Sequence, residues 1–173
     1  GEALKYAAEK YSVEGTGITI SKEQAALAKT LCKGWPVNIR LMDYRLLNEK
    51  FDAIASLGMF EHVGYKNYKR YMQVVRRCLR EDGLFLLHTI GGNSAHAFTD
   101  QWLNKYIFPH AMIPTIQLIG QFIEGLFVME HWQNFSVDYD KTLLAWHSNI
   151  VQNWDKLKAK YDPVFFRMWR DPP

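Results

Sequence analysis

Short apolar runs that suit β-strands alternate with stretches of helical periodicity, and this alternation constrains the fold most. The predicted elements are, in order, helix 2–11, strand 16–20, helix 22–32, strand 37–42, strand 51–57, helix 67–80 and strand 84–90. Strands that alternate with helices indicate a doubly wound, parallel α/β sheet. In such sheets ligands bind beyond the carboxyl ends of the strands. We therefore expect the chemistry in the loops after Ile20, Met42, Leu57 and Ile90.

Local sequence signals support several of these predicted elements. Ser21 and Gln24 match a capping box at the start of a helix. The helix 67–80 carries an apolar inner stripe and a cationic outer face, and residues 81–83 predict a turn after it. Strand 84–90 is almost continuously apolar, which predicts burial on both faces.

The pattern loosens after residue 90. Residues 91–94 predict a loop and residues 115–127 a helix. Residues 127–135 are a strand candidate with three aromatic side chains, and residues 138–161 form a long predicted helix. A short amphipathic tail ends at Pro173.

The composition limits the classes of protein. The chain has 173 residues with 48% hydrophobic and 23% charged residues, which fits one globular domain over 1–173. A net charge of +3 is too weak to argue for nucleic acid, and 14% aromatic residues suit an apolar ligand. Cys32 and Cys78 lack metal-ligand spacing, so no metal site is predicted and a reduced, cytoplasmic setting is favoured. The sequence shows no signal-peptide pattern and no apolar run of about 20 residues.

Three polar side chains stand out among apolar neighbours: Glu61, His88 and Tyr139. A Glu, a His and a Tyr in one pocket can act as acid and base or hold a small polar ligand. Structural alternatives stay open for each. Glu61 could cap a loop before the next helix, His88 could be a hydrogen-bonded core residue and Tyr139 a core aromatic. Gln24 could serve only the capping box, and Asp43 could cap a turn.

Longer motifs occur in a fixed order along the chain. They are GITISKEQ (17–24), MDYRLLNEKFD (42–52), GMFEHVGYKNYKRY (58–71), GLFLLHTIGG (83–92), NKYIFPHAMIP (104–114), FVMEHWQNFSVDYDKTLLAW (127–146) and FFRMWR (165–170). Together they resemble the cyclopropane-fatty-acyl-phospholipid synthase family, which includes the mycolic acid cyclopropane synthases. The resemblance covers essentially the whole chain.

The resemblance implies a Rossmann-like enzyme that uses S-adenosylmethionine to methylate the cis double bond of a lipid acyl chain. A carbocation forms, and loss of a proton from the added methyl group closes the cyclopropane ring. In this family a bound bicarbonate takes that proton. By motif position, the bicarbonate would be held by the side chains of Glu61, His88 and Tyr139 and by the backbone of Ile90.

The motif positions also imply a set of cofactor contacts. These residues are Gly1, Thr19, Ile20, Gln24, Asp43, Tyr44 and Leu57. Several family features are absent: the glycine-rich first motif before Gly1, the cysteine of the bicarbonate site, and the first and last strands of the sheet. We therefore expect a single methyltransferase domain that is incomplete at both ends.

The expected partner is an unsaturated phospholipid at the membrane surface, reached by a cytoplasmic protein that binds the membrane peripherally. The features that suit such docking are a cationic helix face (Lys69, Arg70, Arg76, Arg77, Arg80) and an aromatic tail (Phe165, Phe166, Trp169). A solvated face and core packing are the respective alternatives. Two other functions stay open: methylation of a fatty acid or small molecule without ring closure, and a non-catalytic fragment. The oligomeric state is also open, a homodimer included.

Overall fold

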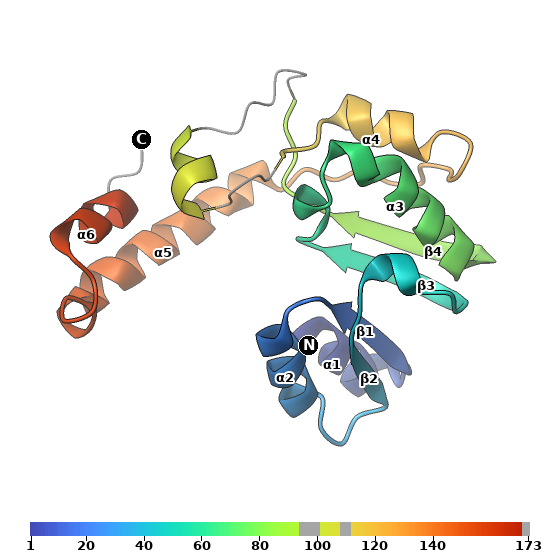
Figure 1. The fold of residues 1–173 in the computed structure, drawn as a ribbon, viewed down its shortest axis with the longest axis horizontal. Coiled ribbons are helices and arrows are strands. Elements are labelled where there is room, and N and C mark those ends of the chain that lie inside the picture. Colours follow the sequence, from blue (N-terminus) through green and yellow to red (C-terminus); the bar gives the residue numbers. More distant parts are fainter. Residues whose placement is uncertain (94–100, 108–111, 171–173) are drawn as a thin grey trace. The chain divides into compact units, whose positions relative to one another are not determined.

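The computed structural model describes residues 1–93, 101–107 and 112–170 (Figure 1). The chain divides into two compact units, Gly1–Val128 and Met129–Pro173, and each is described by itself. The single domain expected from the composition stays a prediction.

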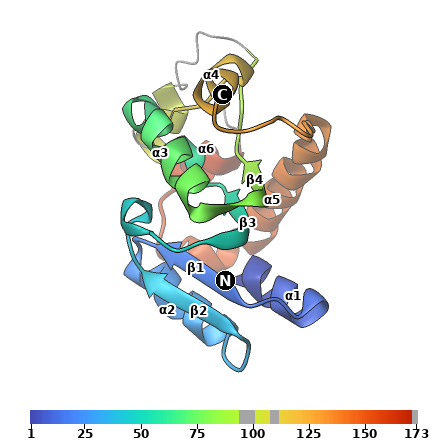
Figure 2. The same ribbon diagram turned by 90° about the vertical axis from the view of Figure 1, so that its right-hand side faces the viewer.

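The first unit begins with a parallel pair of strands covered by two helices (Figure 2). The elements are α1 (Glu2–Tyr11), β1 (Gly15–Thr19), α2 (Lys22–Leu31) and β2 (Val37–Leu41). Small side chains on α2 pack with Cys32 and Ile39, and Leu4 of α1 packs against the same cluster. A Cβ on Gly17 would lie 2.8 Å from side-chain carbons of both Leu4 and Ile39, so the glycine allows α1 to approach β1 closely.

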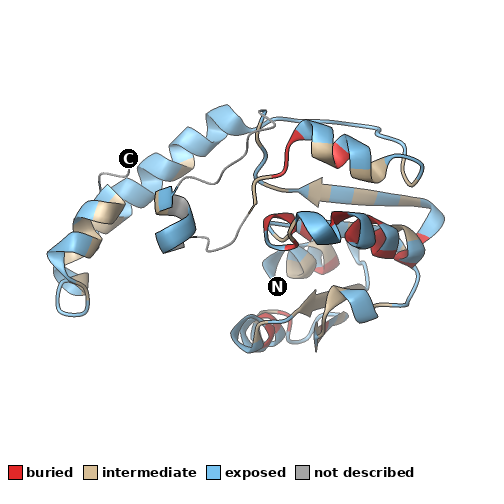
Figure 3. Cartoon of the chain, turned by 45° about the horizontal axis from the view of Figure 1, so that its top comes forward, coloured by how far each residue is buried: buried red, intermediate tan, exposed pale blue. Residues whose placement is uncertain are grey.

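A second parallel pair carries the larger core. Its elements are η1 (Tyr44–Leu46), β3 (Phe51–Leu57), η2 (Phe60–His62), α3 (Tyr65–Cys78), β4 (Leu79–His88), η3 (Leu103–Ile107) and α4 (Ile116–Ile123). Helices α3 and α4 lie on the same side of β3 and β4 (Figure 1). The predicted inner stripe of α3 is confirmed, because Tyr68, Tyr71, Met72, Val75 and Cys78 are all buried (Figure 3).

The two strand pairs are separate sheets, with β1 hydrogen-bonded to β2 and β3 to β4. Both pairs are parallel, as the alternation of strands and helices predicts. Within the described residues no strand links the two pairs. This separation fits the expectation that the first strand of the family's sheet is absent.

The prediction that residues 84–90 are buried on both faces is wrong. Phe85 and Leu87 pack against the core, but Leu84 is 70% and Leu86 is 59% exposed. The reason is that α3 and α4 cover one face of β4 only. A strand is buried on both faces only where other elements cover its second face, and the apolar sequence of the strand does not show whether such elements are present.

The turn predicted at residues 81–83 is also wrong. These residues belong to β4, which begins at Leu79, directly after α3 ends at Cys78. The pairing shifts between Phe51↔Leu79 and Ala53↔Leu84, so the extra residues form an irregularity in the strand and not a loop.

The second unit consists of α5 (Ser136–Leu157) and α6 (Pro163–Arg170). The two helices contact through aromatic rings, with Trp154 stacked on Phe166 at 4.5 Å between centroids. Helix α5 corresponds to the helix predicted at 138–161, and α6 lies in the predicted amphipathic tail. The strand predicted at 127–135 is absent. A strand needs a paired backbone, and this segment has no strand partner in the described residues. Among the described helices, none is long and apolar enough to cross a bilayer.

Candidate functional site

Glu61 lies in η2, immediately beyond the carboxyl end of β3, and is only 7% exposed. Its Oε1 accepts a hydrogen bond of 2.7 Å from the backbone N–H of Ile90, which follows β4. Its carbonyl oxygen accepts from the N–H of Met112 at 3.1 Å. The structure therefore brings Glu61 and Ile90 together at the strand ends, where the sheet topology predicts the chemistry.

In the described residues the Glu61 side chain bonds no group of the loop before α3, so its alternative role as a cap of that loop is not supported. Gly64 occupies the N-cap position of α3 and supplies no side-chain hydrogen bond. The Glu61 side chain bonds instead across to the loop after β4. Burying a carboxylate costs free energy, which the hydrogen bond from the Ile90 N–H partly offsets.

The other oxygen of the carboxylate is unpaired. In the described part of the chain, Glu61 Oε2 and Tyr68 Oη are both buried without a hydrogen-bond partner, and so is Ser56 Oγ. Burial, with a contribution from the Glu61 charge, raises the pKa of Tyr68 to about 12. Burial also raises the pKa of Tyr71 to about 12. Both phenols therefore stay protonated at physiological pH.

His88 lies at the end of β4, and its side chain is exposed. Its carbonyl oxygen accepts from the N–H of Gly58, so the backbone joins the ends of β3 and β4. The alternative role of His88 as a buried core residue is therefore wrong. No hydrogen bond between the His88 and Glu61 side chains is recorded in the described residues, and their joint action stays a prediction.

Tyr139 lies near the start of α5 in the second unit. Its side chain is 43% exposed, and its ring meets that of Trp146 edge-on at 6.1 Å. No residue of α5 is buried, so the core-aromatic alternative for Tyr139 is not supported within this unit. Its approach to Glu61 stays a prediction.

Four of the seven predicted cofactor residues line one cleft of about 640 Å³: Gly1, Thr19, Gln24 and Leu57. The cleft lies among α1, α2, β1 and the end of β3. The hydroxyl of Thr19 donates to Gln24 Oε1 at 2.8 Å. The capping box is only half formed, because Ser21 Oγ accepts from the Gln24 N–H while the Gln24 side chain bonds Thr19. The Gln24 side chain therefore does not complete the capping box, and its contact with a cofactor stays a prediction.

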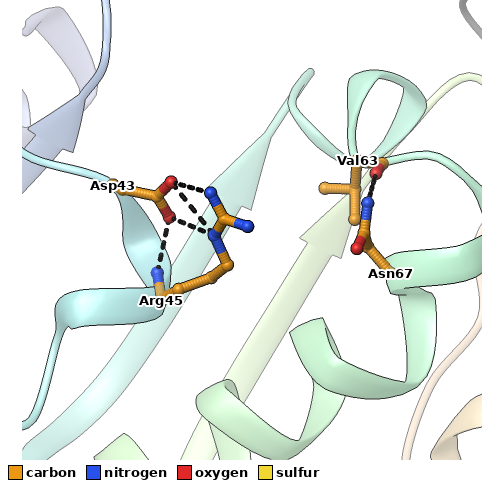
Figure 4. A network of polar contacts seen from close by, with 4 residues as sticks. All are labelled: Asp43, Arg45, Val63 and Asn67. Atoms are coloured by element: carbon orange, nitrogen blue, oxygen red, sulfur yellow. Dashed lines mark hydrogen bonds and ion pairs between the residues drawn. The ribbon is translucent and has the colours of Figure 1, made fainter.

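The other three predicted cofactor residues do not line this cleft. Ile20 is 79% exposed. The Asp43 carboxylate accepts from the Arg45 backbone N–H at 2.9 Å and from its guanidinium at 2.5–3.0 Å (Figure 4). These bonds lower the pKa of Asp43. Tyr44 packs edge-on against the Tyr71 ring at 5.4 Å.

Asp43 therefore fits its alternative role as the cap of η1, since its side chain bonds the Arg45 N–H. Nearby, the Asn67 side-chain amide donates to the Val63 carbonyl within the turn that leads into α3 (Figure 4). The sequence reasoning missed the bond between Arg45 and Asp43, although the two residues are only two positions apart.

Known proteins resemble this chain in sequence and in fold. The sequence profile of the mycolic acid cyclopropane synthetase family matches residues 1–171. The cyclopropane-fatty-acyl-phospholipid synthase of Escherichia coli K12 is 47% identical over 169 residues, which cover 98% of this chain and 44% of that protein. A probable fatty acid methyltransferase of Pseudomonas putida is 32% identical over 183 residues, covering 98% and 46% of the two chains.

The fold agrees with the sequence match. A solved mycolic acid cyclopropane synthase, complexed with SAH and CTAB, superposes with a TM-score of 0.87 at 26% identity. The match covers 98% of this chain and 66% of that one. The chain spans less than half the length of the curated relatives it matches. Its α/β architecture is part of a Rossmann-like methyltransferase fold, and the chain belongs to the mycolic acid cyclopropane synthetase family.

Proposed function

We propose that the chain is the catalytic part of an enzyme that converts a cis double bond of an unsaturated phospholipid acyl chain into a cyclopropane ring. The observation that carries this proposal is the Glu61 carboxylate, buried and held by the Ile90 N–H at the ends of the paired strands β3 and β4. The 47% identity to a cyclopropane-fatty-acyl-phospholipid synthase supports the choice of reaction.

S-adenosylmethionine would supply the methyl group in this reaction. The cleft beside Gly1 fits it, because its volume is large enough for a nucleoside-sized ligand and it combines apolar walls with polar groups. Thr19 and Gln24 would offer hydrogen-bonding atoms to the cofactor, and Leu57 an apolar surface. Gly1 would contact the cofactor as part of the cleft wall, where the lack of a Cβ lets it lie close to Ala28 of α2. Ile20, Asp43 and Tyr44 are proposed as outer contacts on the evidence of their motif positions alone.

Bicarbonate would accept the proton whose loss closes the ring. The residues near Glu61 fit a small oxyanion, since the Ile90 N–H already binds one carboxylate oxygen here. The Ile90 N–H would share its hydrogen between Glu61 Oε1, which it bonds here, and an oxygen of bicarbonate. Glu61 Oε2 is an acceptor for the bicarbonate hydroxyl. His88 and Tyr139 would donate to its other oxygens.

The first prediction concerns the cofactor cleft. Gln24→Ala in the full-length protein should weaken S-adenosylmethionine binding by roughly five- to tenfold, the effect of losing about 1 kcal/mol of hydrogen bonding. Calorimetric titration measures this directly. Gln73→Ala, an exposed change on α3, is the matched control and should bind like the wild type. Equal affinity of the Gln24 and Gln73 variants would show that Gln24 serves the helix alone.

The second prediction concerns the membrane. Lys69 and Arg70 are exposed on α3, whereas Arg77 donates to the Leu47 carbonyl and Arg80 pairs with Asp52. We propose that a cytoplasmic protein docks peripherally on the membrane through the face of α3 that carries Lys69 and Arg70. The binding free energy gained is roughly 1 kcal/mol per basic residue near an anionic surface.

The full-length protein should therefore co-sediment with anionic phospholipid vesicles at low ionic strength and dissociate as salt rises. Neutral vesicles are the control. Binding that changes neither with the charge of the lipid nor with the salt concentration would exclude electrostatic docking through α3.

A second candidate function is methylation of an acyl chain without ring closure. The similarity to a probable fatty acid methyltransferase of Pseudomonas putida supports this second candidate. The two reactions differ in their products, because ring closure leaves a methylene bridge and simple methylation leaves a methyl branch.

A further inference from the structure

Two buried oxygens near η2 have no partner in the described residues: Glu61 Oε2 and Tyr68 Oη. Glu61 is 7% exposed and Tyr68 is fully buried. Buried polar atoms are almost always hydrogen-bonded, and an unpaired one costs about 1–3 kcal/mol. Two such atoms need a physical explanation, and neither residue lines the cofactor cleft.

The two groups are chemically complementary. A carboxylate oxygen only accepts hydrogen bonds, and a neutral phenol has one hydrogen to donate. Phe60, the residue before Glu61, stacks on the Tyr68 ring at 4.1 Å between centroids with an interplanar angle of 18°. This stack holds Tyr68 against η2. The negative charge of Glu61 adds to the effect of burial in raising the pKa of Tyr68.

We propose that Tyr68 is a positioning residue for Glu61, acting through one bound water that accepts from Tyr68 Oη–H and donates to Glu61 Oε2. Both atoms are buried and unpaired, and a buried water commonly bridges polar atoms that do not bond each other directly.

The bridge would fix the orientation of the carboxylate. Ile90 N–H holds Oε1, and the water would hold Oε2, so the carboxylate plane could not rotate. A carboxylate oxygen has two acceptor positions, so Oε2 keeps one for a proton-bearing ligand. The catalytic consequence rests on the proposed function, whereas the bridge itself does not.

Tyr68→Phe in the full-length protein tests the role, because it removes the hydroxyl and keeps the buried ring. We expect kcat to fall about tenfold or more, as for loss of a hydrogen bond to a charged group, with KM for S-adenosylmethionine unchanged. Tyr65→Phe is the matched control. Tyr65 is on the same helix, 47% exposed, with its ring edge-on to Tyr68, and its variant should retain full activity.

A double variant separates positioning from general damage. If Tyr68 acts through Glu61, Glu61→Gln combined with Tyr68→Phe should be no slower than Glu61→Gln alone. Additive losses, or a Tyr68→Phe variant as active as Tyr65→Phe, would overturn the proposal.

A high-resolution crystal structure of the full-length protein gives a readout independent of activity. We expect a water within hydrogen-bonding distance of both Glu61 Oε2 and Tyr68 Oη, and its loss in Tyr68→Phe. A wild-type structure without this water would overturn the bridge. A protein that holds the water but forms no cyclopropane product would instead overturn the proposed function.

Discussion

Glu61→Gln in the full-length protein should lower turnover by roughly one to three orders of magnitude, the scale of losing one preorganised polar contact in an active site. The substitution keeps the size of the side chain and the acceptor for the Ile90 N–H, so local structure should persist. It removes the negative charge and one of the two carboxylate acceptors. The affinity for S-adenosylmethionine should stay nearly unchanged, because the cofactor cleft does not include Glu61.

Steady-state kinetics measures the turnover, and calorimetric titration measures the affinity for S-adenosylmethionine. Glu81→Gln, the same change at an exposed position of β4, is the matched control and should leave both quantities unchanged. Wild-type turnover in the Glu61 variant would remove Glu61 from the reaction. A large loss of cofactor affinity would point to a structural role instead.

Alkaline pH should destabilise the protein through two buried phenols. The pKa values of Tyr68 and Tyr71 are raised from 10.0 to about 12 in the folded state. The unfolded chain loses these protons first as pH rises above 10, so it is stabilised relative to the folded state. Stability is therefore complete below pH 10 and is lost as pH rises toward 12, by roughly 2–3 kcal/mol for each tyrosine.

Urea unfolding of the full-length protein between pH 9 and 12 measures this loss. The variant with both tyrosines changed to Phe is the control, since all other titrating groups are common to the two proteins. Its free energy of unfolding should fall less steeply with pH than that of the wild type. Parallel pH dependences would mean that the two phenols ionise normally in the folded protein.

Much of the local structure follows from the sequence because its signals are local. Ser21 bonds the Gln24 N–H and so starts α2 where the capping pattern predicts. The inner stripe of α3 is buried as its spacing predicts. The parallel pairing of β3 and β4 brings Glu61 to Ile90, which follows from their positions at two neighbouring strand ends.

Features that depend on distant partners could not be predicted in this way. Leu84 and Leu86 are exposed because burial needs a covering layer, which strand residues do not encode themselves. Residues 127–135 have strand-like composition but no strand to pair with in the described chain. The periodicity of α3 marks Tyr68 only as a core aromatic, and the observation behind its proposed role is its buried, unpaired hydroxyl.

The identity of the lipid product tests the central claim most directly. The full-length protein would be incubated with vesicles of a cis-unsaturated phospholipid and S-adenosylmethionine carrying a ¹³C-labelled methyl group, and the acyl chains analysed by mass spectrometry and NMR. We predict chains heavier by one labelled methylene, with the label in a cyclopropane CH₂ and the double bond gone. A labelled methyl branch, or an unchanged acyl chain with the labelled cofactor intact, would contradict the account.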